Sequence, residues 1–349
     1  IQGAIDAASD GATIAIRPGV YEEVLTIRGK RLQLKGDGNP EIRGPQPRAV
    51  SPARGARGTI NYGAGGGGSL QGLLVTGGDN GIVGFNAEEP PSALRVQDVH
   101  VQGTGRGILW SGAPLHLKNN SFSKVSWHAI SIPCLSVPLQ TFVVDGIAAV
   151  DSEQAGIYMS NCPGAASCDN NNSAVNMVKN VSLAFNKGGG IVAVHSTLCV
   201  KDSYIDFATT GGMIFLGSDA VTRNNDVNFT KGVPLNASTL LYGMGIINWE
   251  YQDVPAHVTV ENTDIYQPDS VGIGNFSSHL AYKSTLMTCA GGEPGIPNIL
   301  SETFPGHPVS VVDDQGGNKC GCPLSNGTCS DSSTGGPQPP QPLGSEAFD

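Results

Sequence analysis

The chain has 349 residues, with 20 Lys and Arg against 30 Asp and Glu, and a formal net charge of −10. The negative balance argues against nucleic acid as a partner and against an anionic membrane surface. No apolar run approaches the roughly 18 residues that a membrane-spanning helix needs. The 48 glycines and 23 prolines, with only 14% charged residues, are typical of many short strands joined by tight turns.

The first residues predict a helical cap over residues 1–11. Apolar residues recur with helical spacing at Ile1, Ala4, Ile5 and Ala8. Together they would lay one apolar face over the end of the strands that follow, and Asp10-Gly11 would end the helix. Because the chain begins at Ile and not at Met, we expect that a preceding segment was removed or that the sequence is a fragment.

A repeat of about 22 residues follows the cap. Each unit has a short alternating strand that ends at Asn or Asp, and Gly with a second apolar strand follows about ten residues later. The Asn and Asp positions are Asp98, Asn119, Asn180, Asp202, Asn224 and Asn262. A short period with two or three strands per unit and no helical pattern predicts an all-β parallel β-helix of about ten turns over residues 12–290.

The six Asn and Asp residues are predicted to stack as a structural ladder. Their turn position tolerates left-handed backbone geometry, where Gly is the natural substitute. Stacked Asn side chains can also bond from one turn of the coil to the next. We therefore expect all six in one column with little side-chain exposure.

The opening of the chain also resembles a known group of proteins. The matching pieces are Ile1-Gln2, Ala4-Ile5, Ala7-Ala8, Gly11, Ile14, Pro18-Gly19, Tyr21 and Glu23. They resemble the opening of right-handed parallel β-helix proteins: pectinesterases, pectate-lyase-like proteins and repeat proteins of the periplasmic copper-maturation type. The resemblance covers residues 1–36 and, as a generic repeat, roughly residues 70–276. It implies a right-handed coil and says little about activity.

The catalytic motifs of the pectin-acting families are not matched. A pectinesterase would carry its carboxylates in an Asp-Phe-Ile-Phe-Gly strand, of which Asp206-Phe-Ala-Thr-Thr210 keeps two residues in five. Asp206 is therefore interpreted as a turn residue. A lyase needs a base together with positive charge or calcium, whereas basic residues are few and scattered here. His128 and His195 are interpreted as ordinary turn or surface residues.

A glycoside hydrolase of this fold would need two or three carboxylates on neighbouring turns. Asp226, Glu250 and the pair Asp313-Asp314 are candidates that no motif supports. We predict no catalytic residue, no cofactor and no metal site.

The second strand of each unit predicts an apolar outer stripe. If Ile108, Ile130, Ile157, Ile191, Ile214 and Ile246 point inward, the residue after each points outward. The predicted stripe comprises Leu109, Tyr158, Val192, Phe215 and Ile247, with Ser131 as the polar exception. An apolar stripe on an outer face indicates that something covers it, either the chain's own C-terminal tail or a neighbouring subunit. If it lined an open groove instead, Tyr158, Phe215 and Trp110 would be platforms for sugar rings.

Eight cysteines indicate disulfides formed in an oxidising compartment. The predicted bonds join Cys162 to Cys168 and two of Cys320, Cys322 and Cys329 to each other. The remaining tail cysteine would reach Cys289 or another cysteine of the coil. The alternative, a zinc site at the tail cysteines, lacks the usual CxxC spacing. Residues 291–349 are predicted to form a disulfide-pinned, Pro/Gly-rich extension.

The chain has seven Asn-x-Ser/Thr sequences, which indicate a secreted glycoprotein. Asn171, Asn228, Asn236, Asn275 and Asn326 are the predicted glycan carriers. Asn119 and Asn180 are predicted to be bare, because a buried ladder position cannot hold a sugar.

Two functions remain open at this point. The first is a non-catalytic structural or interaction glycoprotein of an extracellular or cell-surface assembly, such as a sheath, wall or fibre. The alternative is a carbohydrate-active enzyme (polysaccharide lyase, esterase or glycoside hydrolase) or a carbohydrate-binding module, with polysaccharide as its partner. Converging carboxylates, or a His–Tyr–Arg set, at a surface cleft would favour the alternative.

Overall fold

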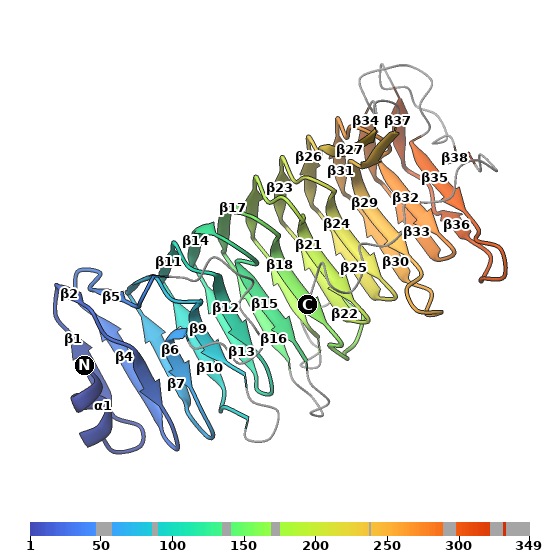
Figure 1. The fold of residues 1–349 in the computed structure, drawn as a ribbon. Helices are drawn as coiled ribbons and strands as arrows, with labels where there is room; N and C mark the ends of the chain where they lie inside the picture. Colours follow the sequence, from blue (N-terminus) through green and yellow to red (C-terminus); the bar gives the residue numbers. More distant parts are fainter. Residues whose placement is uncertain are drawn as a thin grey trace.

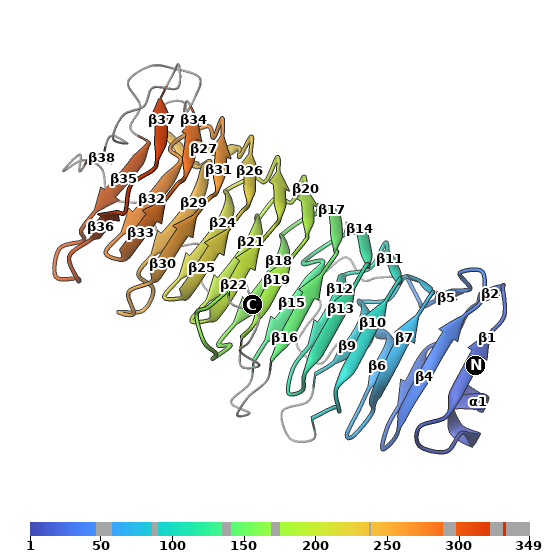
Figure 2. The same ribbon diagram turned by 180° about the vertical axis from the view of Figure 1, so that it is seen from behind.

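A computed structural model describes residues 1–46, 58–85, 90–134, 141–168, 175–236, 239–288, 298–321 and 331–332. The side chains of 233–242 and 331–332 are not described. The described residues form one long coil whose turns stack from the N-terminal to the C-terminal end (Figures 1 and 2).

Three parallel sheets, here named sheets A, B and C, run the length of the coil. Sheet A contains β1 (Thr13–Ile16), β4 (Arg31–Gly36), β7 (Gly67–Gln71), β10 (Leu94–Gln97), β13 (Leu115–Lys118), β16 (Phe142–Asp145), β19 (Met177–Lys179), β22 (Thr197–Lys201), β25 (Asp219–Arg223), β30 (His257–Glu261), β33 (His279–Lys283) and β36 (Val311–Asp314). Sheet B contains β2 (Val20–Tyr21), β5 (Glu41–Arg43), β8 (Leu74–Thr76), β11 (His100–Gln102), β14 (Ser121–Val125), β17 (Ala148–Ser152), β20 (Ser182–Ala184), β23 (Tyr204–Asp206), β26 (Asp226–Asn228), β31 (Asp264–Tyr266), β34 (Leu286–Thr288) and β37 (Lys319–Gly321).

Sheet C contains β3 (Leu25–Ile27), β6 (Gly58–Tyr62), β9 (Asn80–Gly84), β12 (Arg106–Trp110), β15 (Ile130–Pro133), β18 (Ala155–Ser160), β21 (Gly189–Val194), β24 (Gly211–Leu216), β29 (Met244–Trp249), β32 (Ile273–Phe276), β35 (Ile299–Glu302) and β38 (Asp331–Ser332). A separate antiparallel hairpin joins β27 (Gly232–Asn236) to β28 (Thr239–Tyr242). The predicted all-β parallel β-helix is confirmed, with twelve strands in each sheet where about ten turns were expected. β35–β38 continue the same sheets beyond residue 290, where the coil was predicted to end.

The only helix within the described residues is α1 (Gln2–Ala7), at the N-terminal end of the coil (Figure 1). Ile5 is 2% exposed and packs into the core, while the amino group of Ile1 pairs with Glu23 at 2.7 Å. α1 is far too short to cross a membrane, so no described helix qualifies as a membrane span.

The corner between sheets A and B contains the predicted ladder positions. Asp98, Asn119, Asn180, Asp202, Asn224 and Asn262 all adopt left-handed φ values of 46–55°. The backbone N–H of each donates to a carbonyl of the next turn. The six positions therefore recur at one corner of the coil, but the low side-chain exposure predicted for them is wrong. Asp98 is half-buried and the other five are exposed, because the left-handed corner turns their side chains toward solvent.

The buried ladder lies one residue later in the chain. Asn225, 1% exposed, accepts a hydrogen bond from the Ser203 N–H through Oδ1 and donates to the Val200 carbonyl through Nδ2, both at 3.1 Å. Asn120, 2% exposed, makes the same pair of bonds to Val99 and Val96. These amides satisfy backbone groups inside the corner, where water is excluded.

Replacement of Asn225 by Ala should destabilise the coil by about 2 kcal/mol, since it removes two buried hydrogen bonds to backbone groups. We expect a clear fall in melting temperature by calorimetry. Asn224→Gly is the matched control, because Gly suits the φ of 55° at this exposed neighbour. Equal melting temperatures for the two variants would contradict the assignment of the ladder to the inner position.

Candidate functional site

Three phenylalanines form an exposed column at the corner between sheets B and C. Phe185, Phe207 and Phe229 directly follow β20, β23 and β26. The ring centroids are 5.0 Å apart between the first two and 5.1 Å apart between the last two, with interplanar angles of 4° and 9°. Phe185 is 53% exposed, and the other two are half-buried. We call these three residues the Phe column.

The Phe column occupies a backbone conformation that suits Phe poorly. The φ values of Phe185, Phe207 and Phe229 are 56°, 48° and 47°, and a bulky residue at positive φ is an outlier. Each such residue costs about 1–3 kcal/mol. Other turns place Gly103, Asp151 or Gln267 at this corner. Strain of this kind, repeated on three consecutive turns, makes the Phe column a candidate functional feature.

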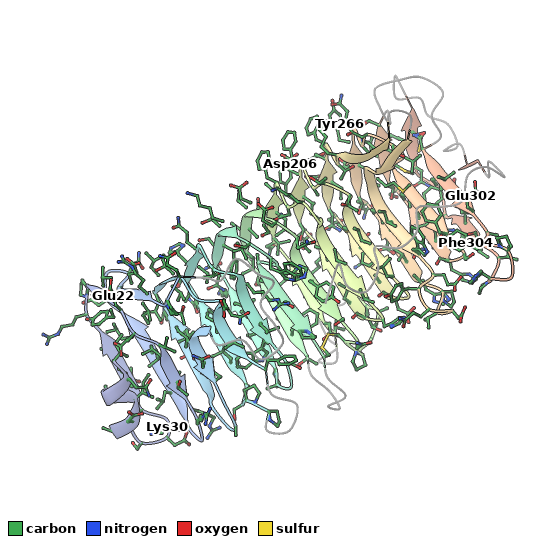
Figure 3. The ribbon with its side chains drawn as sticks, in the orientation of Figure 1. Glu22, Lys30, Asp206, Tyr266, Glu302 and Phe304 are labelled. Atoms are coloured by element: carbon green, nitrogen blue, oxygen red, sulfur yellow. A yellow bond between two sulfur atoms is a disulfide. The ribbon has the colours of Figure 1, made fainter. Side chains whose placement is uncertain are left out.

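The outer face of sheet B next to the Phe column has two polar columns. Strand pairing aligns Tyr204, Asp226 and Asp264 in the first. The same pairing aligns Asp206, Asn228 and Tyr266 in the second. Because alternate residues of a strand share a face, all six side chains lie on one surface, which we call face B. Figure 3 shows Asp206 and Tyr266 along the same outer edge of the coil.

Contacts within face B link its aromatic and acidic groups. The Tyr204 hydroxyl donates to Asp206 Oδ2 at 3.2 Å, while Asp206 Oδ1 is buried and has no hydrogen-bond partner among the described residues. The Tyr266 ring packs edge-on against Phe229 at 5.6 Å. Tyr204 and Tyr266 are each 41% exposed. Asp206 was interpreted as a turn residue, but it ends β23 and belongs to face B, so that interpretation is wrong.

One carboxyl group of face B, that of Asp264, has a shifted pKa. Partial burial, and then the negative charge of Asp226 on the adjacent strand, raise the pKa of Asp264 above its ordinary value. Partial burial is also the first cause that raises the pKa of Tyr204. Asp264 therefore holds its proton more tightly than a free carboxyl does, next to a second acid on the neighbouring turn.

A His–Tyr–Arg set lies on the outer side of sheet C. His128 stacks on Tyr158 at 4.7 Å, and Arg106 lies over the Trp127 ring at 5.8 Å. His128 Nδ1 accepts a hydrogen bond from the Ala155 N–H. The three residues are at most 7% exposed. These residues are buried rather than exposed at a surface cleft, so they do not meet the condition for the carbohydrate alternative.

Four of the five residues of the predicted apolar stripe share one column on sheet C. The observed column on sheet C contains Leu109, Ser131, Tyr158, Val192, Ile214 and Ile247, each at most 7% exposed. Phe215 is wrongly placed in the prediction, because it pairs with Ala193 on the inward side and Ile214 faces outward. The residue directly after Gly212, Met213, aligns with Ile191, so counting from the glycine would have given the right register.

Part of the stripe is covered by loops of the same chain. Ile214 and Ile247 belong to an apolar cluster against which Tyr251, Leu300 and Phe304 pack. The rest of the C-terminal tail, which was predicted to cover the stripe, lies outside the described residues. The predicted sugar platforms are wrong for Trp110, which is 0% exposed and donates from Nε1 to the Ala113 carbonyl at 3.0 Å. Phe215 is also 0% exposed.

The disulfides join Cys134 to Cys162 and Cys168 to Cys199. The predicted bond between Cys162 and Cys168 is therefore wrong: each pairs with a cysteine on another turn of the coil. Cys320 is also disulfide-bonded. Cys289, Cys322 and Cys329 lie outside the described residues, so the predicted tail pairing stays a prediction.

The glycosylation predictions are partly corrected. Asn275 is 0% exposed and its amide donates to the Ser278 carbonyl at 3.1 Å, so it cannot carry a glycan as folded. Asn119 and Asn180 are exposed, which removes the reason for expecting them to be bare. Asn228 is half-exposed within face B. Asn171 and Asn326 lie outside the described residues, as does the side chain of Asn236.

No protein-family model matches the sequence, and no curated protein matches it significantly. Solved structures match in fold. The catalytic domain of a GH87 α-1,3-glucanase with bound tetrasaccharides has a TM-score of 0.62 at 12% identity, covering 88% of this chain and 64% of that chain. The mannuronan C-5 epimerase AlgE6 A-module of Azotobacter vinelandii has a TM-score of 0.53 at 14% identity, covering 92% and 94%.

A thermostable GH87 α-1,3-glucanase from Streptomyces thermodiastaticus has a TM-score of 0.53 at 16% identity, covering 97% of this chain and 67% of that chain. These matches establish the right-handed parallel β-helix fold that the opening residues implied. The chain spans 64% of the first glucanase structure.

Substitution of Asp226 by Asn should lower the pKa of Asp264 toward its ordinary value, because it removes the neighbouring negative charge. A raised pKa in the folded state means that stability is lost as the pH rises through that pKa. As the pH rises through the pKa of Asp264, the free energy of unfolding should therefore fall less in Asp226→Asn than in the wild type. Carboxyl ¹³C titration measures the pKa, with Asp219→Asn on sheet A as control. An unchanged Asp264 titration in Asp226→Asn would contradict the coupling.

Proposed function

We propose that the protein is a secreted carbohydrate-active protein that binds a polysaccharide along face B and the Phe column. The observation that carries the proposal is the Phe column: three stacked, partly exposed rings held at strained backbone positions on consecutive turns. Sugar rings present apolar C–H faces that pack on aromatic rings, while their hydroxyls need polar partners. Face B supplies both kinds of group side by side.

The periodicity of the coil suits a linear polymer. Strands in a sheet repeat about every 4.8 Å, and the Phe rings follow that repeat with centroid spacings of 5.0 and 5.1 Å. A chain of sugars lying along the axis of the coil would meet equivalent contacts on successive turns. Tyr204 and Tyr266 extend the aromatic surface at either side of the acidic groups.

The charge of face B favours a neutral polymer. Asp206, Asp226 and Asp264 lie together on it, and the chain as a whole has a net charge of −10. A polyanion such as a polyuronate would be repelled. A neutral glucan meets no such barrier, and carboxylates are good acceptors for sugar hydroxyls.

Two further observations support the proposal. The glucanases and the epimerase that share the fold act on polysaccharides by their names, and the disulfides are those of an oxidising compartment. The expected non-catalytic structural role has less support than the carbohydrate alternative, since the proteins that share the fold are carbohydrate-active enzymes. Polysaccharide binding by face B also requires Asn228 to carry no glycan, because a sugar there would cover the face.

Phe207→Gly should weaken binding to a neutral glucan about tenfold, the loss of roughly 1.4 kcal/mol of ring contact. The melting temperature should stay near that of the wild type, because relief of about 1–3 kcal/mol of backbone strain offsets two ring pairs of about 0.5–1.5 kcal/mol each. Affinity electrophoresis in gels containing soluble glucans would measure the binding. Lys124→Gly, at the same corner, is the matched control.

Undiminished glucan retardation of Phe207→Gly would contradict the proposal. So would a glycan on Asn228 in glycopeptide mass spectrometry of the native protein. Equal retardation of the wild type by polygalacturonate would contradict the preference for neutral polymers.

A second candidate, hydrolysis of the bound polysaccharide, is favoured by one observation: Asp226 and Asp264 are direct neighbours on adjacent strands, and the pKa of Asp264 is raised. Retaining glycosidases hold two carboxyl groups about 5–5.5 Å apart, close to the spacing of adjacent strands. In this reaction Asp264 would protonate the glycosidic oxygen while Asp226 attacks the anomeric carbon. Water would then release the sugar from Asp226, returning a proton to Asp264.

Asp226→Asn and Asp264→Asn should each abolish release of reducing ends from the glucan that binds, while leaving the retardation assay within about twofold of the wild type. Asp219→Asn serves as the control for loss of one surface carboxylate. Activity that survives in both variants, or a wild type that binds glucan without releasing reducing ends, would rule out hydrolysis at this pair and leave binding alone.

A further inference from the structure

We propose that Glu250, Asp253 and His307 bind one divalent transition-metal ion of the zinc class. The three residues come from the loops that follow β29 and β35 of sheet C, whereas face B lies on sheet B. Their ligand atoms, one carboxylate oxygen each from Glu250 and Asp253 and one ring nitrogen from His307, all lie within 4.8 Å of one another. This site is independent of the proposed polysaccharide surface.

The first two ligands are placed by the end of a strand and a tight turn. Glu250 directly follows β29, and its N–H donates to the Phe276 carbonyl of the next turn. Tyr251 and Val254 then exchange backbone hydrogen bonds at 3.0 and 3.1 Å. The two residues between them, Gln252 and Asp253, have φ values of 53° and 62°. This two-residue turn holds Asp253 at its tip, close to Glu250.

The third ligand comes from the loop after β35. His307 Nδ1 lies 3.0 Å from Glu250 Oε1 and 2.9 Å from Oε2, and 3.8 Å from Asp253 Oδ1. Zinc binds nitrogen and oxygen at about 2.0–2.2 Å, so two ligands of a tetrahedral zinc ion lie roughly 3.3–3.5 Å apart. The separations between His307 Nδ1 and the two carboxylates bracket that value.

A buried carboxylate is the second observation that points to a cation. The Glu250 side chain is 3% exposed. The hydrogen bond from His307 Nδ1 goes to Oε1, and Oε2 has no hydrogen-bond partner among the described residues. A neutral histidine has one ring N–H and cannot satisfy both oxygens. A metal ion bound to Glu250 and His307 would give the buried carboxylate a cationic partner.

Aromatic rings form an apolar floor next to the cluster. Trp249 lies 5.0 Å from Phe276 and 5.8 Å from Phe304, and Phe304 packs edge-on against His307 at 5.9 Å. Figure 3 labels Phe304 and Glu302 in this C-terminal part of the coil. The rings hold the imidazole in place and exclude water from one side of the ion. Asp253, 92% exposed, leaves the other side open to solvent.

The ligand set selects the class of metal. Calcium prefers six to eight oxygen ligands, whereas one imidazole with two carboxylates suits zinc or cobalt. Three protein ligands leave a fourth position for water. The ion would join the 250–254 turn to the 303–307 loop, which are two turns of the coil apart, and so would fasten this loop over the apolar cluster of sheet C.

The test is isothermal titration of the full chain with zinc chloride after treatment with a chelator. We expect one ion per chain and a melting temperature that rises by several degrees when free zinc is about 100-fold above its Kd. Cobalt(II) in place of zinc should give the intense visible absorption of tetrahedral coordination. His307→Ala and Glu250→Gln should each weaken zinc binding at least 100-fold, and His116→Ala, a distant exposed histidine, should bind as the wild type does.

If Glu250→Gln fails to fold, His307→Ala decides the result, because His307 is 38% exposed and its loss leaves the core intact. Undiminished zinc binding in His307→Ala would overturn the proposal. So would absence of zinc binding by the wild type, or calcium binding at this cluster in preference to zinc. None of these outcomes depends on glucan binding, so failure here is distinct from failure of the proposed function.

Discussion

The structure depends on the main-chain register between successive turns. Each strand pairs in parallel with the equivalent strand one turn later, through all three sheets. Side chains of a strand alternate between the two faces, so a slip of one residue would exchange the core for the surface. The corners protect that register, because each turn must change direction at the same place. Residues with left-handed backbone conformation make this change of direction at the corners. The residue types that tolerate this conformation therefore determine which side chains the corners display on the surface.

The two left-handed corners use different side chains for the same backbone task. Between sheets A and B, Asn and Asp tolerate the conformation and can bond from turn to turn, as Asn224 does with Asp202. Between sheets B and C, three consecutive turns use Phe, which tolerates the conformation poorly. The first corner is explained by local geometry alone. The second is not, and that difference makes the Phe column a functional candidate and the Asn/Asp column a structural one.

The sequence predicted the coil, the corner column and most of the stripe because each depends on a period that is visible in one dimension. Phe185, Phe207 and Phe229 also recur every 22 residues. The same period therefore makes the Phe column visible in the sequence, although it was not predicted. The disulfides and the Glu250–His307 contact could not be predicted, because insertions of irregular length separate their members. Cys134 and Cys162 meet since both lie at the end of a sheet C strand on adjacent turns. That equivalence becomes visible only when the strand pairing is known.

The outer faces of sheets B and C both carry aromatic residues, but they differ in how exposed those residues are. On sheet C the outward residues are as buried as the core, and Arg106, His128 and Tyr158 are buried with them. On sheet B the outward tyrosines and the Phe column remain partly open, although their strands are equally well paired. A polymer can reach only the second of these surfaces without moving other parts of the protein. Because Asp264, whose pKa is raised, lies on that same open surface, the proposed binding and any acid–base chemistry on the bound polymer share face B.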